Sequence, residues 1–326
     1  MTDVAAITPV SKERRIAASR WFAPSDRLFH GLTMGAAIAV LLLLGGVILA
    51  LLQGSLPAFS KFGIDFIYTQ AWSPARDNFG ALAPISGTLI TSFIAMLVAV
   101  PLSFGIAIFL TEICPMWLRR PIGTAIELLA GIPSIIYGIW GLFVFAPFMQ
   151  RHVQPFLINT FSGVPVLENL FAGPPYGIGI LTTSLILAIM VLPFITAVSR
   201  DVLETVPAVL KEAAYGLGCT TWEVARRVML PYARAGVLGG VMLGLGRALG
   251  ETMAVTFVIG NAHRIQASIL SPGTTISATI ANEFAEAMGA TYTSSLMALG
   301  LILFLITFIV LAFARLMLLR MNQKAG

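Results

Sequence analysis

The chain has 326 residues, of which 57% are hydrophobic and 11% are charged, and its mean hydropathy is +0.90. Soluble domains carry about 25% charged residues, so this composition excludes an ordinary soluble protein and indicates a membrane protein. The net charge of +5 comes from Lys and Arg residues that flank apolar runs. Because these residues form no basic stripe, we also exclude a nucleic-acid-binding protein.

Six long apolar runs follow one another along the chain, and each is long enough for the roughly 20 residues of a transmembrane helix. They cover residues 29–53, 85–111, 122–148, 177–198, 235–259 and 295–319. This pattern predicts an all-α membrane protein with six transmembrane helices. Pro101 lies inside the second run and is tolerated there, because neighbouring helices can satisfy the carbonyl group that it frees.

The positive charges predict the orientation of these helices. Fifteen of the 20 Lys and Arg residues lie in the N-terminal arm, at 112–121, in the loop 199–234 and in the C-terminal tail. Only four lie in the three other loops. Since positive residues concentrate on the cytoplasmic side of a membrane, we predict a multi-pass protein of the cytoplasmic (inner) membrane. Both termini and the loop 199–234 are then cytoplasmic.

The polar loop between the fourth and fifth runs predicts a helix, a glycine turn and a second helix. Pro207 stands at a first helical position, and Gly218 stands where a left-handed residue would end the first helix. Thr220 and Glu223 have the spacing of a capping box, which would begin the second helix. Pro231 cannot continue a helix, so we expect it to end the second one.

Apart from Arg315, which is counted with the basic tail, three charged residues lie inside the predicted spans, namely Glu127, Arg247 and Glu251. Arg247 follows position 235 by about twelve residues, which places it roughly 18 Å into the fifth helix and near the bilayer centre. A charge facing lipid there costs at least about 2.5–3.5 kcal/mol, so Arg247 must face protein or a water-filled cavity. Glu251 is four residues on, hence on the same helix face. A structural ion pair and a role lining a translocation path are both open.

The third span contains Glu127 and a predicted break at Gly131-Ile132-Pro133-Ser134. Three roles are open for Glu127: an ion pair with a cytoplasmic arginine, hydrogen bonds to a neighbouring helix, or a place on the pathway. The N–H groups of the half-helix that starts at Ser134 would suit an anion, as in transporters with broken helices. A simple proline kink is the alternative.

Glycine recurs every four residues in the fifth span, at Gly236, Gly240 and Gly244. Such stripes allow two helices to approach closely in lipid, so we predict a helix-packing seam here and no ligand.

The loop between the fourth and fifth spans resembles the EAA loop of ABC importer permeases, which is the cytoplasmic segment that docks on the ATPase subunit. The residues that match this motif are Glu212, Ala213, Ala214, Gly218, Leu230 and Pro231. Val228 stands where the family more often has isoleucine, which is a change of similar volume. The resemblance implies that these residues couple the chain to an ATPase.

Three further motifs, at 127–134, 246–254 and 280–284, narrow the resemblance to phosphate-specific ABC importer permeases, closest to the PstC-type subunit. The resemblance implies the type I ABC importer permease fold, a homologous second permease subunit, two copies of a cytoplasmic ATPase and an extracytoplasmic phosphate-binding protein. It also implies that Arg247 and Glu251 are needed for transport. The sister permease subunit has similar motifs, so the assignment between the two stays open.

With this resemblance, we expect a division into a cytoplasmic N-terminal arm, a first transmembrane helix, an extracytoplasmic loop, a permease core and a cytoplasmic tail. These segments cover residues 1–28, 29–53, 54–83, 84–320 (with the coupling loop 199–234) and 321–326.

The expected function is that of a permease subunit that moves inorganic phosphate. The sequence has no phosphate-binding glycine loop, so we expect no ATP hydrolysis, no cofactor and no metal in this chain, with ATP used by the partner ATPase. Other oxyanions, such as sulfate or molybdate, remain alternatives, and an ion-coupled secondary carrier is a further one. A membrane-embedded enzyme would need clustered reactive side chains, whereas the three histidines are scattered.

Overall fold

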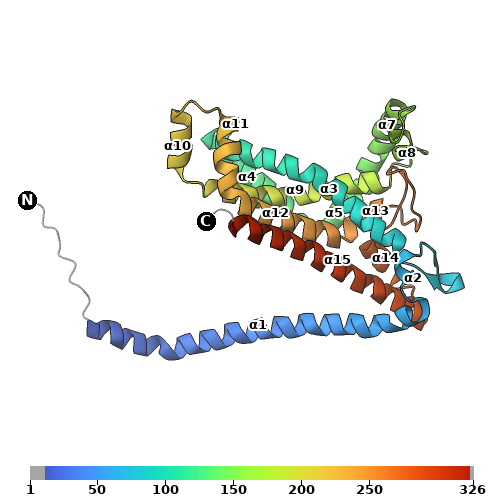
Figure 1. Ribbon diagram of the computed structural model, residues 1–326, viewed down its shortest axis with the longest axis horizontal. Coiled ribbons are helices and arrows are strands. Elements are labelled where there is room, and N and C mark those ends of the chain that lie inside the picture. The colour runs from blue at the N-terminus through green and yellow to red at the C-terminus, as the bar shows by residue number, and fades with distance from the viewer. Residues whose placement is uncertain (1–11, 324–326) are drawn as a thin grey trace, which may run out of the picture. The chain divides into compact units, whose positions relative to one another are not determined.

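The computed structural model describes residues 12–323, which are almost entirely helical (Figure 1). Residues 1–11 of the predicted N-terminal arm and residues 324–326 of the predicted tail lie outside this range. The chain divides into two compact units, one up to Gln53 and the other from Gly54 onward. Each unit is described by itself.

The helix α1 covers Lys12–Phe62. Its described part up to Gln53 forms the first unit, and its last turns belong to the second unit. Residues from Asp26 to Phe62 are long and apolar enough to cross a membrane. The leucines at 41, 42 and 43 are all exposed, as expected for a helix that is apolar all round and meets lipid or another protein. The helix continues to Phe62, nine residues beyond the end that we expected for the first span.

The second unit contains the remaining elements. Its first half comprises α2 (Asp65–Tyr68), β1 (Trp72–Ser73), η1 (Pro74–Arg76), β2 (Asn78–Phe79), α3 (Leu82–Ile108), η2 (Phe109–Ile113), α4 (Met116–Ala130), α5 (Ser134–Trp140), η3 (Gly141–Phe145), α6 (Ala146–Phe148), η4 (Met149–Val153), α7 (Gln154–Phe161) and α8 (Leu167–Leu170). Its second half comprises α9 (Ile180–Glu204), α10 (Ala208–Gly216), α11 (Thr221–Val224), η5 (Ala225–Met229), α12 (Leu230–Gly250), α13 (Met253–Val258), α14 (Ile276–Glu283) and α15 (Ala290–Gln323). The segments η2 to η5 are π-helical.

By length and composition, five helical segments among residues 12–323 can cross a membrane, and a bent pair can count as the sixth. The bent pair is α4 with the helical run from Ser134 to Phe161, and the two parts meet at 89°. Pro133 causes the break, because it has no N–H and restricts the residue before it to extended backbone. The Tyr137 hydroxyl donates to the Leu129 carbonyl at 2.9 Å and so bridges the two parts. The predicted break in the third span is confirmed.

The core of the second unit is built from α3, α9 and α12, which pack against one another. The glycine stripe of α12 lies against α9, where a Cβ atom at Gly244 would approach Ile195 to 2.7 Å and one at Gly236 would approach Val202 to 2.5 Å. Larger residues would push the two helices apart. The predicted packing seam is therefore confirmed.

Pro231 does not end its helix, so this prediction is wrong. One helix runs without interruption from Thr221 to Gly250, and Pro231 is the second residue of α12. The π-helical segment η5 precedes it, so Pro231 stands at the start of a new α-helical ladder, where its missing N–H costs little. The expected fifth span also ends earlier, because Glu251 has extended backbone dihedral angles (φ −67°, ψ 129°).

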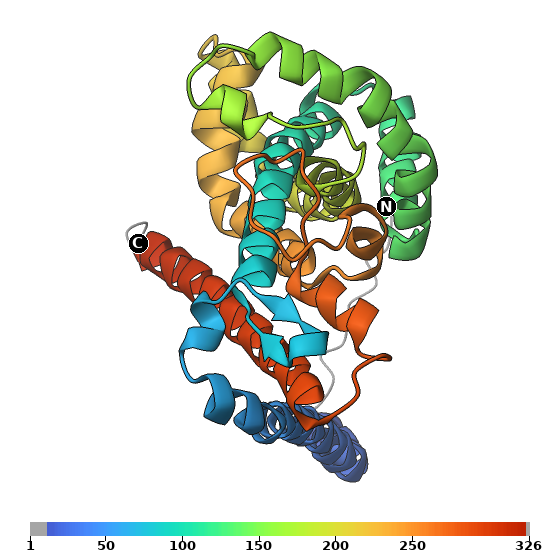
Figure 2. The same cartoon turned by 90° about the vertical axis from the view of Figure 1, so that its right-hand side faces the viewer.

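The loops gather at two opposite ends of the second unit (Figure 1). Helices α10 and α11 lie at one end with the C-terminal part of α15, whereas α7, α8 and α14 lie at the other. Figure 2 shows the β1–β2 hairpin beside α14 and α15, where Trp72 and Phe79 pack with Ile276 and Tyr292. The coupling motif is thus separated from the other long loops by the length of the helices.

Candidate functional site

The loop between α9 and α12 has the predicted helix–turn–helix form. Gly218 has a φ of +88°, its N–H donates to Tyr215 at 2.9 Å, and the N–H of Cys219 donates to Ala214 at 3.2 Å. These two bonds form a Schellman motif, which requires the left-handed residue that glycine provides. Pro207 is the N-cap of α10 and not its first helical residue, since α10 begins at Ala208.

The capping box that begins α11 is confirmed. The Thr220 hydroxyl accepts from the N–H of Glu223 at 3.3 Å, and the Glu223 carboxylate accepts from the N–H of Thr220 at 2.9 Å. Both free donors at this helix start are therefore satisfied, which fixes the angle at which α11 leaves the turn.

The tip of this loop exposes apolar side chains. Leu217 is 86% exposed and Trp222 is 63% exposed. Among the motif residues, Glu212 and Ala213 face outward, whereas Ala214 is buried against the second helix. Leu230 and Pro231 lie away from the tip, in the first turn of α12. Large apolar side chains that are exposed at the tip of a loop suit a protein-binding surface.

An ion pair that the sequence did not reveal fastens the loop to the membrane core. Lys211 of α10 lies 3.0 Å from the carboxylate of Glu112 in η2, and the Tyr215 hydroxyl donates to the same carboxylate at 3.4 Å. The Glu112 side chain is only 8% exposed. The only available signal was a single carboxylate at the end of the second span, and its partner is 99 residues away.

Arg247 lies in the last turn of α12 and lines a cavity of about 580 Å³. Its guanidinium stacks over the Phe194 ring of α9 at 4.5 Å. The other lining residues are all uncharged: Phe194, Gly239, Met242, Leu243, Gly246 and Leu311. The Arg247 Nε–H is buried and has no hydrogen-bond partner. This cavity therefore offers one cation with unused donor capacity.

Glu251 does not pair with Arg247, and the structural ion pair that we considered does not form. Because α12 ends at Gly250, the helical register that would place the two side chains on one face is lost. The Glu251 carboxylate instead accepts from the N–H of Ala254 at 3.3 Å and caps α13. The pathway role of Arg247 and Glu251 stays a prediction.

The structure brings two broken helices together. Helix α5, which begins at Ser134, packs on α13, and a Cβ atom at Gly138 would lie 2.8 Å from Phe257 and 3.0 Å from Ala254. Discontinuous helices that meet in this way form the binding sites of many transporters. The sequence revealed the break before α5 through its proline, but the break before α13 has no proline and was missed.

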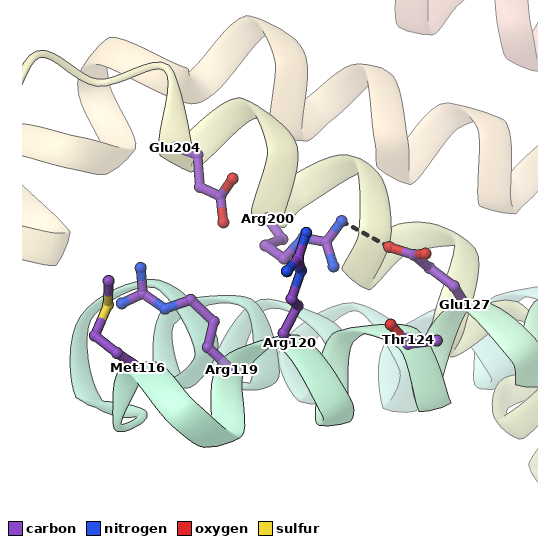
Figure 3. A pocket seen from close by; sticks show the side chains of 7 residues that line it. All are labelled: Met116, Arg119, Arg120, Thr124, Glu127, Arg200 and Glu204. Carbon is purple, nitrogen blue, oxygen red and sulfur yellow. Dashed lines mark hydrogen bonds and ion pairs between the residues drawn. The ribbon is translucent and has the colours of Figure 1, made fainter.

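Glu127 lies in a different pocket, between α4 and α9 (Figure 3). Its carboxylate is 2.8 Å from the guanidinium of Arg200, which also binds Asp201 at 2.8 Å. Of the three roles that were open for Glu127, the ion pair with an arginine is the one that the structure forms. A place on the pathway beside Arg247 receives no support, since the two pockets share no lining residue.

A third polar cluster connects the loops at the opposite end. The Glu283 carboxylate accepts hydrogen bonds from Trp72 and from Tyr292 (2.7 Å), and lies 3.0 Å from His263. Burial raises the pKa of Glu283, but these hydrogen bonds outweigh it and hold the pKa below 4.5. Among the described residues, no group of three or more His, Cys, Asp or Glu side chains is placed to hold a metal ion.

Five or six apolar spans among the described residues, an exposed helical loop and a cavity lined by one arginine between α9, α12 and α15 are the features of a membrane-embedded permease subunit, which is not itself an enzyme. The chain belongs to the family described as binding-protein-dependent transport system inner membrane component, whose model matches residues 103–323.

Relatives match the whole chain. A protein of Mesorhizobium japonicum is 65% identical over 326 residues, which is 100% of both chains, and one of Pasteurella multocida is 60% identical over 301 residues, which is 92% of this chain and 94% of the relative. Both are named phosphate transport system permease protein PstC. A bacterial ABC transporter that imports alginate has a similar fold, with a TM-score of 0.62, 19% identity and coverage of 94% and 99%. The predicted type I ABC importer permease fold is confirmed.

Proposed function

We propose that the chain is a permease subunit of an ATP-driven importer that moves inorganic phosphate across the cytoplasmic membrane. The observation that carries the proposal is Arg247, a guanidinium with an unpaired Nε–H in an otherwise uncharged cavity. Relatives that are 60% and 65% identical over nearly their full length are phosphate permeases, which supports phosphate over sulfate or molybdate.

The cavity supports a pathway role on physical grounds. An anion in a low-dielectric layer is strongly disfavoured unless a charge or hydrogen-bond donors compensate it. Arg247 supplies both, and no carboxylate lies within 4 Å of it among the described residues. We assign Glu251 the role of holding the start of α13 beside this cavity, since it caps that helix. Ser134 is the first residue of α5, which packs against α13.

The exposed loop is the surface that we assign to the ATPase. Glu212, Ala213 and Gly218 are accessible there, and Leu217 and Trp222 offer apolar anchors for a protein partner. ATP is used by that partner, and this chain needs no cofactor of its own. The full importer then contains a homologous second permease, two copies of the ATPase and an extracytoplasmic phosphate-binding protein on the opposite side.

The continuity of the helix that follows the loop suggests how the two sites communicate. A single helix runs from Thr221 to Gly250, so the capping box and Arg247 lie on the same element. The Lys211–Glu112 ion pair attaches α10 to the end of α3 as well. Closure of the ATPases would move the loop as a rigid body, and α12 would pass this movement to the cavity.

The orientation that we propose places the loop, both termini and the tail 321–326 in the cytoplasm. The arm 1–28 and the loop 54–83 then lie on opposite sides of the membrane, joined by the first transmembrane helix. Within the second unit, α10 and the C-terminal part of α15 do lie at one end, which supports this arrangement (Figure 1).

The experiment is uptake of labelled phosphate by proteoliposomes that contain the complete importer. We expect uptake that requires ATP and the ATPase subunit, and that excess unlabelled phosphate suppresses much more than sulfate or molybdate does. Equal suppression by sulfate would contradict the substrate assignment. Uptake driven by an ion gradient without the ATPase would instead support a secondary carrier.

A further inference from the structure

The pocket between α4 and α9 has a composition that the transport pathway does not explain. It has a volume of about 460 Å³ and lies at the end of the second unit that carries α10 and α11 (Figures 1 and 3). Its lining consists of three arginines, two glutamates and two uncharged residues: Arg119, Arg120, Arg200, Glu127, Glu204, Met116 and Thr124.

The charges in this pocket are unequally paired. Glu127 is engaged by Arg200, which Asp201 also neutralises. In the part of the chain that the structure describes, no carboxylate lies within 4 Å of Arg119 or Arg120. Two guanidinium groups on successive residues therefore form no ion pair, and Glu204 is the one carboxylate of the lining that forms none either.

The Arg119 side chain has a buried hydrogen-bond donor without an acceptor. One of its terminal nitrogens donates to the carbonyl of Thr111, which anchors the side chain against η2. Its Nε–H is buried and has no hydrogen-bond partner. A buried donor without a partner costs free energy, so an acceptor that enters the pocket would be stabilised there.

The local backbone favours an anion in the same place. Arg119 and Arg120 lie near the N-terminal end of α4, where the helix dipole is positive and two more cations are unfavourable unless an anion offsets them. Gly123 lets the Arg200 guanidinium lie across α4, since a Cβ atom at this position would come within 2.7 Å of it. All three arginines line this pocket. In Figure 3 the guanidinium groups of Arg120 and Arg200 lie together, whereas that of Arg119 points toward Met116.

We propose that this pocket binds a phosphate oxyanion, held by Arg119 and Arg120, with Arg200 forming the inner wall. Guanidinium groups match the geometry of phosphate oxygens and bind them with charge-assisted hydrogen bonds. The group comes either from free inorganic phosphate or from the headgroup of an anionic lipid, which present the same chemistry. This site is additional to the pathway that we propose at Arg247 and does not depend on it.

The pocket also has a short connection to the coupling loop. Thr111, which anchors Arg119, precedes Glu112, and Glu112 pairs with Lys211 of α10. Movement of Arg119 towards a bound anion therefore acts on the segment that holds the loop. We expect occupancy of the pocket to change the ATP hydrolysis rate of the importer.

The test uses the importer with Arg247→Gln and without the phosphate-binding protein, which removes the other anion sites that we assign. Binding of radiolabelled inorganic phosphate is measured in nanodiscs of phosphatidylcholine alone, and thermal stability is compared with nanodiscs that also contain phosphatidylglycerol. Arg120→Gln is the main variant, because this side chain is exposed. Arg119→Gln is the second variant. Arg315→Gln, an exposed arginine of α15 at the same end, is the matched control.

We expect Arg120→Gln to weaken phosphate binding about tenfold, equivalent to about 1.4 kcal/mol, while Arg315→Gln leaves it unchanged. Glu204→Gln should strengthen binding, because it removes a like charge from the pocket wall. If the lipid is the ligand, phosphatidylglycerol should raise the melting temperature only where Arg119 and Arg120 are present.

Two results would overturn the proposal. One is that neither phosphate binding nor stabilisation by lipid changes when Arg119 or Arg120 is replaced. The other is that Arg315→Gln reduces phosphate binding as much as Arg120→Gln does. The connection to the loop is tested separately with Arg247 intact. In that importer, we expect the anion to change the ATP hydrolysis rate, and we expect Arg120→Gln to abolish this change. If the anion changes the ATP hydrolysis rate equally with and without Arg120→Gln, the connection is refuted. None of these measurements uses uptake, so their failure is distinguishable from failure of the transport assignment.

Discussion

Replacing Arg247 with glutamine separates its role in transport from its role in the fold. The only interaction that the structure gives its guanidinium within the fold at short range is the stacking on Phe194, worth about 0.5–2 kcal/mol. The variant should therefore assemble with little loss of stability. A phosphate ion in the cavity would lose a charge-assisted hydrogen bond worth about 1.5–3 kcal/mol. At about 1.36 kcal/mol per factor of ten, uptake should fall about ten- to hundredfold.

The assay is the initial rate of ATP-driven phosphate uptake in proteoliposomes, divided by the amount of assembled complex measured by size-exclusion chromatography. Phe194→Leu is the control, since it removes the aromatic ring and keeps the cation, and it should retain most of the uptake. The reasoning is refuted if Arg247→Gln transports normally. It is also refuted if uptake falls only in proportion to a loss of assembled complex, because Arg247 would then be structural.

Three further predictions concern the turn, the packing seam and the Glu283 cluster. Gly218→Ala should cost about 1–2 kcal/mol through its positive φ and reduce the coupling of ATP hydrolysis to uptake, whereas Gly216→Ala should not. Gly244→Val should lower the melting temperature of the importer, because overpacking against α9 costs about 1–3 kcal/mol, whereas Gly105→Ala has open space and should be neutral. The stabilisation by Glu283 is present above its usual pKa of 4.5 and is lost as the pH falls through its lowered pKa, so the melting temperatures of wild type and Glu283→Gln should converge in acid.

Each of these predictions has a result that contradicts it. Equal coupling in Gly218→Ala and Gly216→Ala would show that the turn tolerates a side chain. An unchanged melting temperature for Gly244→Val would mean that α9 and α12 are not packed at this point. If the melting temperatures of wild type and Glu283→Gln differ by the same amount at all pH values, the Glu283 carboxylate is not the source of the acid sensitivity.

The candidate site could be predicted from the sequence only where its chemistry is local. The Thr220–Glu223 capping box, the turn at Gly218 and the break before Ser134 follow from residues within a few positions of one another. Their backbone chemistry has few alternatives, and all three were predicted. Arg247 was singled out from the sequence as an unusual charge, but the residues that surround it were not predicted.

What the sequence missed depends on partners that are far apart in the chain. Glu127 binds Arg200, which is 73 residues away, and Glu112 binds Lys211. The pairing of Glu251 with Arg247, one of the two alternatives left open, does not form, because it required a continuous helix. A local rule also failed at Pro231, because the preceding π-helical turn lets the helix continue.

The sequence by itself determined that this is a multi-span membrane protein, where the break before Ser134 and the caps around Gly218 lie, and which loop carries the EAA-like motif. Apolar runs and backbone preferences are properties of short segments, so they are readable without neighbours. The tertiary structure alone decided which charges pair, where α12 stops and which arginines are left without partners. The physical reason is that a helix that is apolar all round has no distinguished face, and only the packing of α4, α9 and α12 selects the side chains that meet.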